Sequence, residues 1–260
     1  RRVSVSAYAA LVACPYRFFA RYVLGLGEMD EVTEEMDKSE YGALVHRALE
    51  RFHERYPLVS ALSESEALAA LQGCVVEVFS GPVADNFLST GWRLRWEKRL
   101  SAYLDWQRAN EAQGWRWAQA ETRVACVLPL GSAGEVELYG RIDRIDQRAD
   151  AAGGAALFDY KTQTAKAIRD RLPDDVQLPA YALMHGGALQ AAYVALDDEK
   201  VLAVGVADEE HPLAAAAEAQ GERLQAVFMA LHAGAQLPAQ GVDRQCSWCE
   251  MSGVCRRAYV

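Results

Sequence analysis

The sequence lacks a long apolar run, a surplus of positive charge, and any histidine in its cysteine-rich tail. With no stretch of eighteen apolar residues and no charged-then-apolar start, it predicts neither a membrane span nor a signal peptide. A net charge of −9 argues against a simple basic nucleic-acid binder. Locally basic runs at 93–99, 161–171 and 256–257 are each more typical of a solvated face than of a phosphate contact. We therefore expect a cytoplasmic protein with no membrane partner.

The composition is that of a chain that can bury a substantial core. It has 260 residues, of which 51% are hydrophobic. Cys74 and Cys126 lie inside apolar helical and strand patterns, and both are predicted to be core thiols. The sequence begins with Arg1 and Arg2 rather than with methionine, which suggests a fragment of a longer polypeptide.

The C-terminal tail carries a cysteine motif with metal-ligand spacing, Cys246-x₂-Cys249-x₅-Cys255. Without a secretory context, these thiols are better interpreted as metal ligands than as disulfides. Three thiolates can close on one metal centre but leave its fourth position open, and the missing histidine excludes a compact two-cysteine, two-histidine zinc site. Cys14 would have to arrive from the far end of the chain. Four thiolates suit either Zn²⁺ or a [4Fe–4S] cluster.

The stretch YGRIDRIDQRADAAGGAALFDYKT predicts two strands joined by a Gly/Ala-rich turn. The strand period of two puts Asp159 and Lys161 on one side of the second strand, and Phe158 and Tyr160 on the other. The turn can bring Asp143 beside the first pair. Two carboxylates and an ammonium form an oxygen-ligand site for a hard cation such as Mg²⁺, with a cation to hold or activate water. This is the smallest set of groups for metal-assisted phosphodiester hydrolysis.

A simpler interpretation of this stretch stays open. Strand-borne aspartate and lysine usually form a solvated face, and Arg141 and Arg144 could pair with Asp143 and Asp146. The D-x-K motif alone is weak, so the surrounding elements have to decide.

Helical patterns dominate the first part of the chain. Ser4 or Ser6 can cap a helix through AYAALVACPYRFFARYVLGL, which Cys14-Pro15 interrupts. A second amphipathic helix is predicted at 40–55. Two more are predicted at 64–80 and at about 93–113.

The histidine of the second helix, His46, shares a face with Glu50 four residues later. A lone helical histidine is more often structural than catalytic, so the helix alone does not assign it a role.

The second part of the chain changes to strand periodicity, followed by helix and strand again. Strands are predicted at 121–130, 135–147, 155–162, 191–196 and 201–206. Between the third and fourth, a short helix capped by Asp174 or Asp175 places Gln177 and Tyr181 on one face. An Ala-rich helix runs from 212 to about 233. This order predicts a mixed five-stranded sheet flanked by helices, and not alternating βαβ units.

Taken together, these elements resemble the PD-(D/E)xK nucleases of the RecB/AddB type, in particular the subgroup with an iron–sulfur staple. The motifs occur in the family's order: a Cys-Pro helix, G-x-x-x-H, G-x-x-D-R-I-D, D-Y-K-T, Q-L-x-x-Y and C-x₂-C-x₅-C. The resemblance covers nearly the whole chain. It implies an α/β (α+β), restriction-endonuclease-like fold in a single domain, 1–260, with a mainly helical part (1–115), a nuclease core (116–235) and a cysteine staple (236–260).

The resemblance also implies roles for individual residues. His46, Asp143 and Asp159 match the ligands of a catalytic Mg²⁺ or Mn²⁺, and Lys161 matches the lysine that positions or activates the attacking water. Glu121 sits where many members have a glutamate, which is the weakest match. The remaining matches are Gln177 and Tyr181, which contact the scissile strand, and the four cluster ligands Cys14, Cys246, Cys249 and Cys255.

The implied activity is Mg²⁺-dependent hydrolysis of DNA phosphodiesters, as an exonuclease domain in a DNA-repair or recombination helicase–nuclease assembly. DNA and the helicase or nuclease subunits or domains of the parent protein would be the partners. A non-catalytic DNA-binding or scaffold module of such an assembly is the alternative. Such modules lose the acids, whereas Asp143, Asp159 and Lys161 are all present here.

Overall fold

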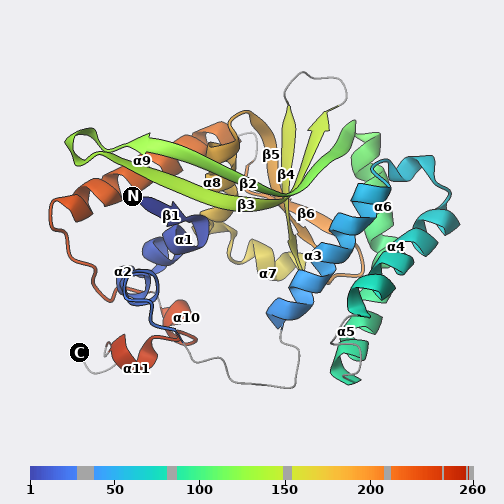
Figure 1. Ribbon diagram of the computed structural model, residues 1–260, viewed down its shortest axis with the longest axis horizontal. Helices are drawn as coiled ribbons and strands as arrows, with labels where there is room; N and C mark the ends of the chain where they lie inside the picture. Colours follow the sequence, from blue (N-terminus) through green and yellow to red (C-terminus); the bar gives the residue numbers. More distant parts are fainter. Residues whose placement is uncertain are drawn as a thin grey trace.

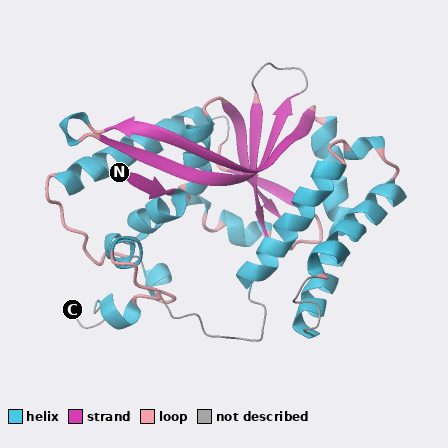
Figure 2. Ribbon diagram, viewed as in Figure 1, coloured by secondary structure: helices cyan, strands magenta, loops and turns pink. Residues whose placement is uncertain are grey.

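In its computed structural model, the protein consists of a mixed sheet that lies between two groups of helices (Figures 1 and 2). The structure describes residues 1–27, 38–80, 87–148, 154–207, 212–241, 243–255 and 257, so most of the turn expected between the two central strands lies outside it. No described helix is long and apolar enough to cross a membrane.

The described part of the sheet has six strands in the order β1-β3-β4-β5-β6, and β2 also pairs with β3. Their bounds are β1 (Arg2–Ser4), β2 (Trp115–Pro129), β3 (Glu135–Arg148), β4 (Ala155–Lys161), β5 (Ala188–Ala195) and β6 (Leu202–Gly205). Strands β2, β3 and β4 pair antiparallel in sequence order, so the two strands predicted around the Gly/Ala-rich turn, β3 and β4, are neighbours in the sheet. The β1–β3 and β4–β5 pairs are parallel, so the sheet is mixed, as predicted.

The sheet has one strand more than the five predicted. Strand β1 pairs with β3 at Glu137–Tyr139, beside the stretch where β3 pairs with β4. It is only three residues long, which is too short for a period of two to distinguish it from a helix cap.

Helices cover both faces of the sheet (Figure 1). The longer ones are α1 (Val5–Ala13), α3 (Lys38–Arg55), α4 (Glu64–Phe79), α5 (Phe87–Glu97), α6 (Leu100–Ala112), α8 (Gln177–His185) and α9 (Leu213–His232). The shorter elements are α2 (Pro15–Phe18), the π-helix η1 (Phe19–Val23), η2 (Val59–Ala61), η3 (Gly131–Ala133), α7 (Ala165–Arg169), η4 (Leu172–Asp174), α10 (Asp243–Cys246) and α11 (Ser252–Cys255).

The N-terminal helix begins and breaks as predicted. Ser4 caps α1, since its hydroxyl oxygen accepts the backbone N–H of Ala7 at 3.1 Å. Cys14 is extended and ends α1, and Pro15 occupies the first position of α2, where its missing N–H costs no helical hydrogen bond.

The single helix predicted at 93–113 is wrong, because two helices occupy this region. The chain turns at residues 98–99, where the backbone N–H of Arg99 donates to the carbonyl of Trp96 at 2.8 Å. Trp96 and Leu100 are both fully buried, and the turn lets both side chains enter the core. Neither glycine nor proline marks the break, so the sequence pattern could not locate it.

The core has two layers, one on each face of the sheet, and β4 contributes to both. Leu157 packs into the layer with α1, α8 and α9. Phe158 and Tyr160 pack into the layer with α3, α4 and α6, and this confirms the alternation predicted for the strand. Asp159 and Lys161 therefore extend from the same face as Leu157.

A close approach between β3 and the helix layer favours glycine at position 140. A Cβ there would lie 3.0 Å from the ring of Tyr181, 3.1 Å from Val5 and 3.2 Å from Met184. The glycine of the G-x-x-D-R-I-D motif thus lets α8, which carries Gln177 and Tyr181, pack directly against the strand that carries Asp143.

Candidate active site

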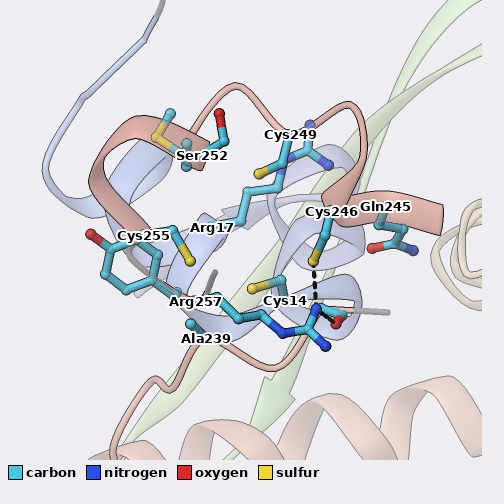
Figure 3. A pocket seen from close by; sticks show the side chains of 12 residues that line it. Cys14, Arg17, Ala239, Gln245, Cys246, Cys249, Ser252, Cys255 and Arg257 are labelled. Carbon is cyan, nitrogen blue, oxygen red and sulfur yellow. Dashed lines mark hydrogen bonds between the residues drawn. The ribbon is translucent and has the colours of Figure 1, made fainter. Parts of the chain in front are cut away.

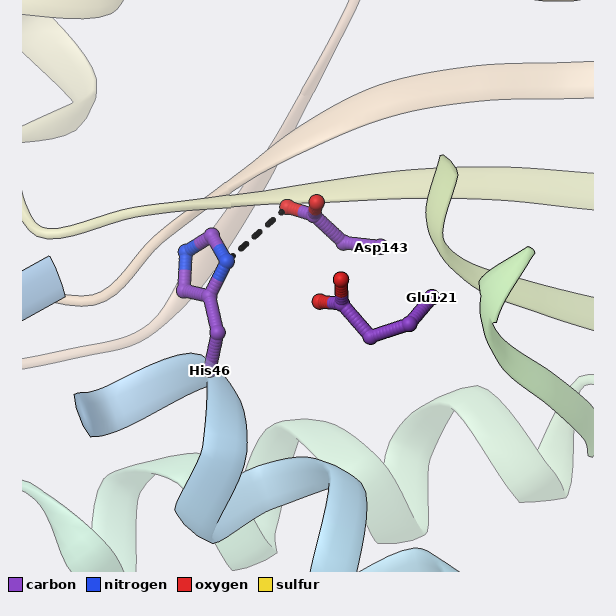
Figure 4. A group of neighbouring side chains, drawn as sticks. All are labelled: His46, Glu121 and Asp143. Atoms are coloured by element: carbon purple, nitrogen blue, oxygen red, sulfur yellow. Dashed lines mark ion pairs between the residues drawn. The ribbon is translucent and has the colours of Figure 1, made fainter. Parts of the chain in front are cut away.

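Three side chains from three elements converge where α3 crosses β2 and β3 (Figure 4). His46 extends from α3 toward Glu121 of β2 and Asp143 of β3. Each offers one ligand atom, and the three atoms lie within 4.8 Å of one another. Imidazole nitrogen and carboxylate oxygen are ligands that a small divalent cation accepts. The geometry therefore fits a single metal ion.

The orientation of His46 supports this interpretation. Its Nε2 lies 2.9 Å from the carbonyl oxygen of Tyr160, and since a carbonyl only accepts, Nε2 carries the proton. Burial lowers the pKa of His46, so the ring is neutral near pH 7. The free lone pair on Nδ1 then faces the Asp143 Oδ2 at 3.4 Å. Two acceptor atoms this close repel each other, and a cation bound between them would remove the repulsion. The hydrogen bond from Nε2 fixes the orientation of the ring, as in many metal sites.

The two aspartates of the predicted site lie on neighbouring strands. Arg144 of β3 pairs with Phe158 of β4, so one step further along this antiparallel register Asp143 comes next to Asp159. The backbone N–H of Tyr160 donates to Asp143 Oδ2 at 2.9 Å. Burial, and secondly the negative charge of Asp159, raise the pKa of Asp143 well above its usual range. A bound divalent cation would offset both effects.

Asp159 is held by a second set of predicted residues. Lys161 Nζ lies 2.5 Å from its Oδ2, and the Gln177 side-chain amide donates to its Oδ1 at 2.7 Å. The same amide nitrogen lies 2.9 Å from the Tyr181 hydroxyl, as expected for two residues one helical turn apart. The six residues proposed from the sequence are thus connected in one site. Asp159, however, points to Lys161 and Gln177 and does not belong to the tight trio.

Glu121 takes the place in the trio that the sequence motifs suggested for Asp159. Its φ is +48°, and it is the one non-glycine residue with positive φ in the described chain. A side chain held in that region is strained, and such strain concentrates at functional sites. The register of β2 against β3 shifts between Trp117 and Gln119, just before it. Periodicity could not single out Glu121, because this irregular backbone breaks the alternation.

Asp175 begins α8 in the way the sequence suggested, although Val176 occupies the N-cap position itself. The Asp175 carboxylate accepts the backbone N–H groups of Gln177 and Leu178 at 3.3 and 3.1 Å. This fixes the helix end that directs Gln177 at Asp159.

A buried polar cluster lies beneath the site, on the opposite face of the sheet. Arg144 and Asp146 are 1% and 0% exposed and form a two-pronged ion pair with two contacts of 2.7 Å. The simpler interpretation of the sequence therefore holds for this pair, although the pair is buried and not solvated. The Asn110 side chain also donates to Asp146 at 2.7 Å.

Tyr160 connects this buried cluster to the site. Its hydroxyl lies 3.1 Å from Arg144 Nη1 and 3.0 Å from the hydroxyl of Tyr103. Its backbone N–H and carbonyl contact Asp143 and His46 on the other face. The cluster thus fixes the residue between Asp159 and Lys161, so the backbone that positions these side chains has little freedom.

Replacing Arg144 with methionine is expected to lower the free energy of unfolding by about 3–5 kcal/mol, because the Asp146 carboxylate is left buried without its partner. Urea unfolding measures this loss. The double variant Arg144→Met with Asp146→Leu should lose less than the single one, since no unpaired charge remains. Removing the charge of Arg51, which forms a surface ion pair with Glu77, should cost much less stability than the Arg144 change. Equal losses for the buried and the surface pair would contradict the prediction.

The four cysteines proposed as ligands line one cavity (Figure 3). The cavity has a volume of about 310 Å³ and lies between α2, α10 and α11. Gly241 sits between two of the thiols, because a Cβ there would be 3.0 Å from Cys246 Sγ and 3.7 Å from Cys14 Sγ. The far ends of the chain therefore meet at this cavity. Cys74 and Cys126 do not line it; Cys74 is buried, as predicted, whereas Cys126 is only partly buried.

The spacing of the sulfurs bears on the kind of group that would fit. In the described residues, no three of the four cysteines bring their sulfurs within 4.8 Å of one another. In a tetrahedral zinc site with Zn–S bonds of about 2.3 Å, neighbouring sulfurs are only ~3.8 Å apart. Ligands that each bind a different iron of a cluster stand farther apart. The open cavity between the thiols is the space that such a larger group would need.

The chain belongs to the PD-(D/E)XK nuclease superfamily, whose family model matches residues 2–256. The superfamily predicted from the motifs is thereby confirmed, and the mixed sheet flanked by helices agrees with its fold.

Among curated proteins, the chain is similar to two that are each named as a subunit of an ATP-dependent helicase/deoxyribonuclease. The one from Desulforudis audaxviator is 29% identical over 212 residues, which cover 74% of this chain and 18% of the relative. The one from Moorella thermoacetica is 28% identical over 179 residues, covering 62% of this chain and 15% of the relative. The chain thus spans less than a fifth of either protein. The match to the solved structure of SSO0001 covers all of this chain and 87% of that one, at 15% identity and with a TM-score of 0.42.

Proposed function

We propose that the protein is a metal-dependent deoxyribonuclease, acting as an exonuclease domain of a DNA-repair or recombination helicase–nuclease assembly in the cytoplasm. The observation that carries the proposal is the convergence of His46, Glu121 and Asp143 within 4.8 Å, beside the Asp159–Lys161 pair. Membership of the nuclease superfamily and similarity to helicase/deoxyribonuclease subunits support it. A helicase subunit or domain is the proposed partner.

His46, Glu121 and Asp143 would hold the Mg²⁺ or Mn²⁺, with Asp159 at its border. When bound, the ion supplies a Lewis acid for the phosphate and a lower pKa for the attacking water. The metal-binding set here has two acids, as the motif-based set has, with Glu121 in place of Asp159, and it gives a hard cation the oxygen ligands it prefers.

Lys161 would stabilise the negative charge that develops on the phosphate during hydrolysis. Its ammonium is held by Asp159 at 2.5 Å and by the Gln177 amide oxygen at 3.4 Å, so it needs little rearrangement to stay directed at the site. A fixed cation beside the phosphate stabilises the growing negative charge and orients the water that attacks. Gln177 and Tyr181 then lie where the backbone of the bound strand would pass.

The test uses end-labelled single- and double-stranded DNA with Mg²⁺, with and without EDTA. We expect shortened products with Mg²⁺ and none with EDTA or with Asp143→Asn. DNA binding without any Mg²⁺-dependent cleavage would favour the alternative, a non-catalytic scaffold module. Cleavage that survives in Asp143→Asn would overturn the assignment of the site.

Glu121→Gln is expected to raise the Mg²⁺ concentration needed for half-maximal cleavage by about tenfold, because the amide keeps the size of the side chain but loses its charge. Titration of activity with Mg²⁺ measures the shift. The control is Glu135→Gln at the exposed start of β3, which should leave the requirement unchanged. An unchanged requirement in Glu121→Gln would remove Glu121 from the metal site.

We further propose that Cys14, Cys246, Cys249 and Cys255 hold a [4Fe–4S] cluster with a structural role. The spread of the sulfurs around a cavity of about 310 Å³ favours a cluster over the Zn²⁺ alternative. Such a group would link the start of α2 to the C-terminal segment. Its four ligands lie outside the part of the chain, His46 to Tyr181, that carries the proposed catalytic residues. Its presence and effect are tested through Cys14, as argued in the Discussion.

A further inference from the structure

A second cavity of about 310 Å³ lies beside the proposed catalytic lysine. It is formed by the end of β4, by α7 and η4, and by the start of α8. Lys161 and Gln177 line it and also contact Asp159, so the cavity adjoins the Asp159 side of the candidate active site. Its volume is at the lower end of the range of about 300–1,000 Å³ that is usual for small-molecule sites.

The lining of this cavity combines cations with apolar and aromatic surface. Lys161 lines the cavity, and its Nζ lies 5.0 Å from the centre of the Tyr193 ring. Ile168 and Leu172 contribute apolar side chains to the lining, and Arg171 lines the cavity and is exposed. Lys161, although paired with Asp159, and Arg171 are two cations for phosphate oxygens, and the aromatic ring and the aliphatic side chains offer surface for a sugar or base, as in sites that bind nucleotides.

The one acid among the described lining residues does not oppose an anion strongly. Asp175 accepts the Tyr193 hydroxyl at 2.6 Å and the backbone N–H groups at the start of α8. Its charge is therefore directed at these donors.

Arg171, by contrast, has only uncharged partners among the described residues. Its Nε donates to the carbonyl of Ala167 at 3.1 Å, and its guanidinium contacts the side-chain oxygen of Gln163. Lys166 on the same short helix is neutralised by Asp170 at 2.8 Å. Arg171 is held in place and keeps its charge for a ligand.

We propose that this cavity binds one nucleotide of the cleaved DNA strand, next to the phosphate that is hydrolysed. Lys161 and Arg171 would contact phosphate oxygens, and Tyr193, Ile168 and Leu172 would contact the sugar or base. The inference rests on the proposed nuclease function, because it takes DNA as the ligand. It adds the position of the strand and names Arg171 as a binding residue outside the matched motifs.

The experiment measures binding separately from cleavage. Fluorescein-labelled (dT)₂₀ is titrated with the whole chain in EDTA, and fluorescence anisotropy is followed at several NaCl concentrations. Arg171→Gln is expected to weaken binding about tenfold, the loss of one charge-assisted contact. It should also reduce the slope of log K against log[NaCl] by about 0.7, the value for one single-strand phosphate contact. Arg171→Lys should restore the slope, because the charge returns.

The matched control is Arg169→Gln, an exposed arginine of α7 that does not line the cavity. Unchanged affinity and slope in Arg171→Gln, or an equal loss in Arg169→Gln, would overturn the proposal. A competition arm separates nucleotide from phosphate: thymidine 5′-monophosphate should displace (dT)₂₀ at lower concentration than inorganic phosphate. Equal displacement would overturn the nucleotide assignment. A wild-type chain that shows the Arg171 dependence in EDTA but never cleaves with Mg²⁺ would refute the nuclease function and leave the binding site standing.

Discussion

Lys161→Met is expected to lower the rate of Mg²⁺-dependent DNA cleavage by about a thousandfold and to leave the fold intact. The side chain is two-thirds buried, at 32% exposure, and its ammonium is the cation closest to Asp159. Removing a single preorganised group that stabilises transition-state charge costs about 10²–10³ in rate, and Lys161 would also orient the water. Methionine keeps the aliphatic length, so packing against Tyr193 is retained.

The matched control for this prediction is Lys166→Met. That lysine lies five residues further on, is 84% exposed and pairs only with Asp170 among the described residues. Its replacement should not change cleavage. The double variant Lys161→Met with Asp159→Asn serves as a folding control, because it removes the acid that the single change leaves unpaired. Full activity in folded Lys161→Met would refute the assignment of the lysine.

Cys14→Ser is expected to remove a brown absorption from the protein and to lower its free energy of unfolding by about 4–5 kcal/mol. The magnitude comes from the analogy with a disulfide: a link between Cys14 and the C-terminal thiols closes a loop of more than 200 residues and so restricts the unfolded chain. Visible absorption, iron content and urea unfolding measure the two effects together.

Cys126→Ser is the control for the cysteine prediction, since that thiol is half-buried in β2 and does not line the cavity. It should keep the colour and most of the stability. A colourless wild-type protein with one zinc per chain would instead favour the Zn²⁺ alternative. Unchanged colour in Cys14→Ser would exclude Cys14 as a ligand.

The central geometry of the site could be predicted because it follows from strand and helix periods. Asp159 and Lys161 share a face since they are two residues apart on β4, and Gln177 meets Tyr181 since they are four apart on α8. The position of Asp143 beside Asp159 follows from the antiparallel register of the β3–β4 pair. The catalytic roles of these residues remain predictions.

What the sequence could not predict depends on irregular backbone or on long-range packing. Glu121, which only the weakest of the family matches indicated, joins His46 and Asp143 through a left-handed conformation that strand periodicity does not predict. The break between α5 and α6 has no glycine or proline and results from burying both Trp96 and Leu100. Arg144 looked like a solvated strand residue, yet it is fully buried, because Tyr160 and Tyr103 from other elements satisfy its donors.

The meeting of Cys14 with the C-terminal thiols has a consequence for how the protein matures in the cell. Cys14 leaves the ribosome more than 230 residues before Cys246. At roughly 5–20 residues per second, translation takes on the order of ten seconds or more to supply the remaining thiols. Strand β1 also has to wait for Glu137–Tyr139 before it can pair. The segment around β1 and Cys14 therefore lacks these neighbours until Glu137–Tyr139 and then Cys246 to Cys255 have been synthesised, and a metal centre that uses all four thiols would form only after Cys255 has been added.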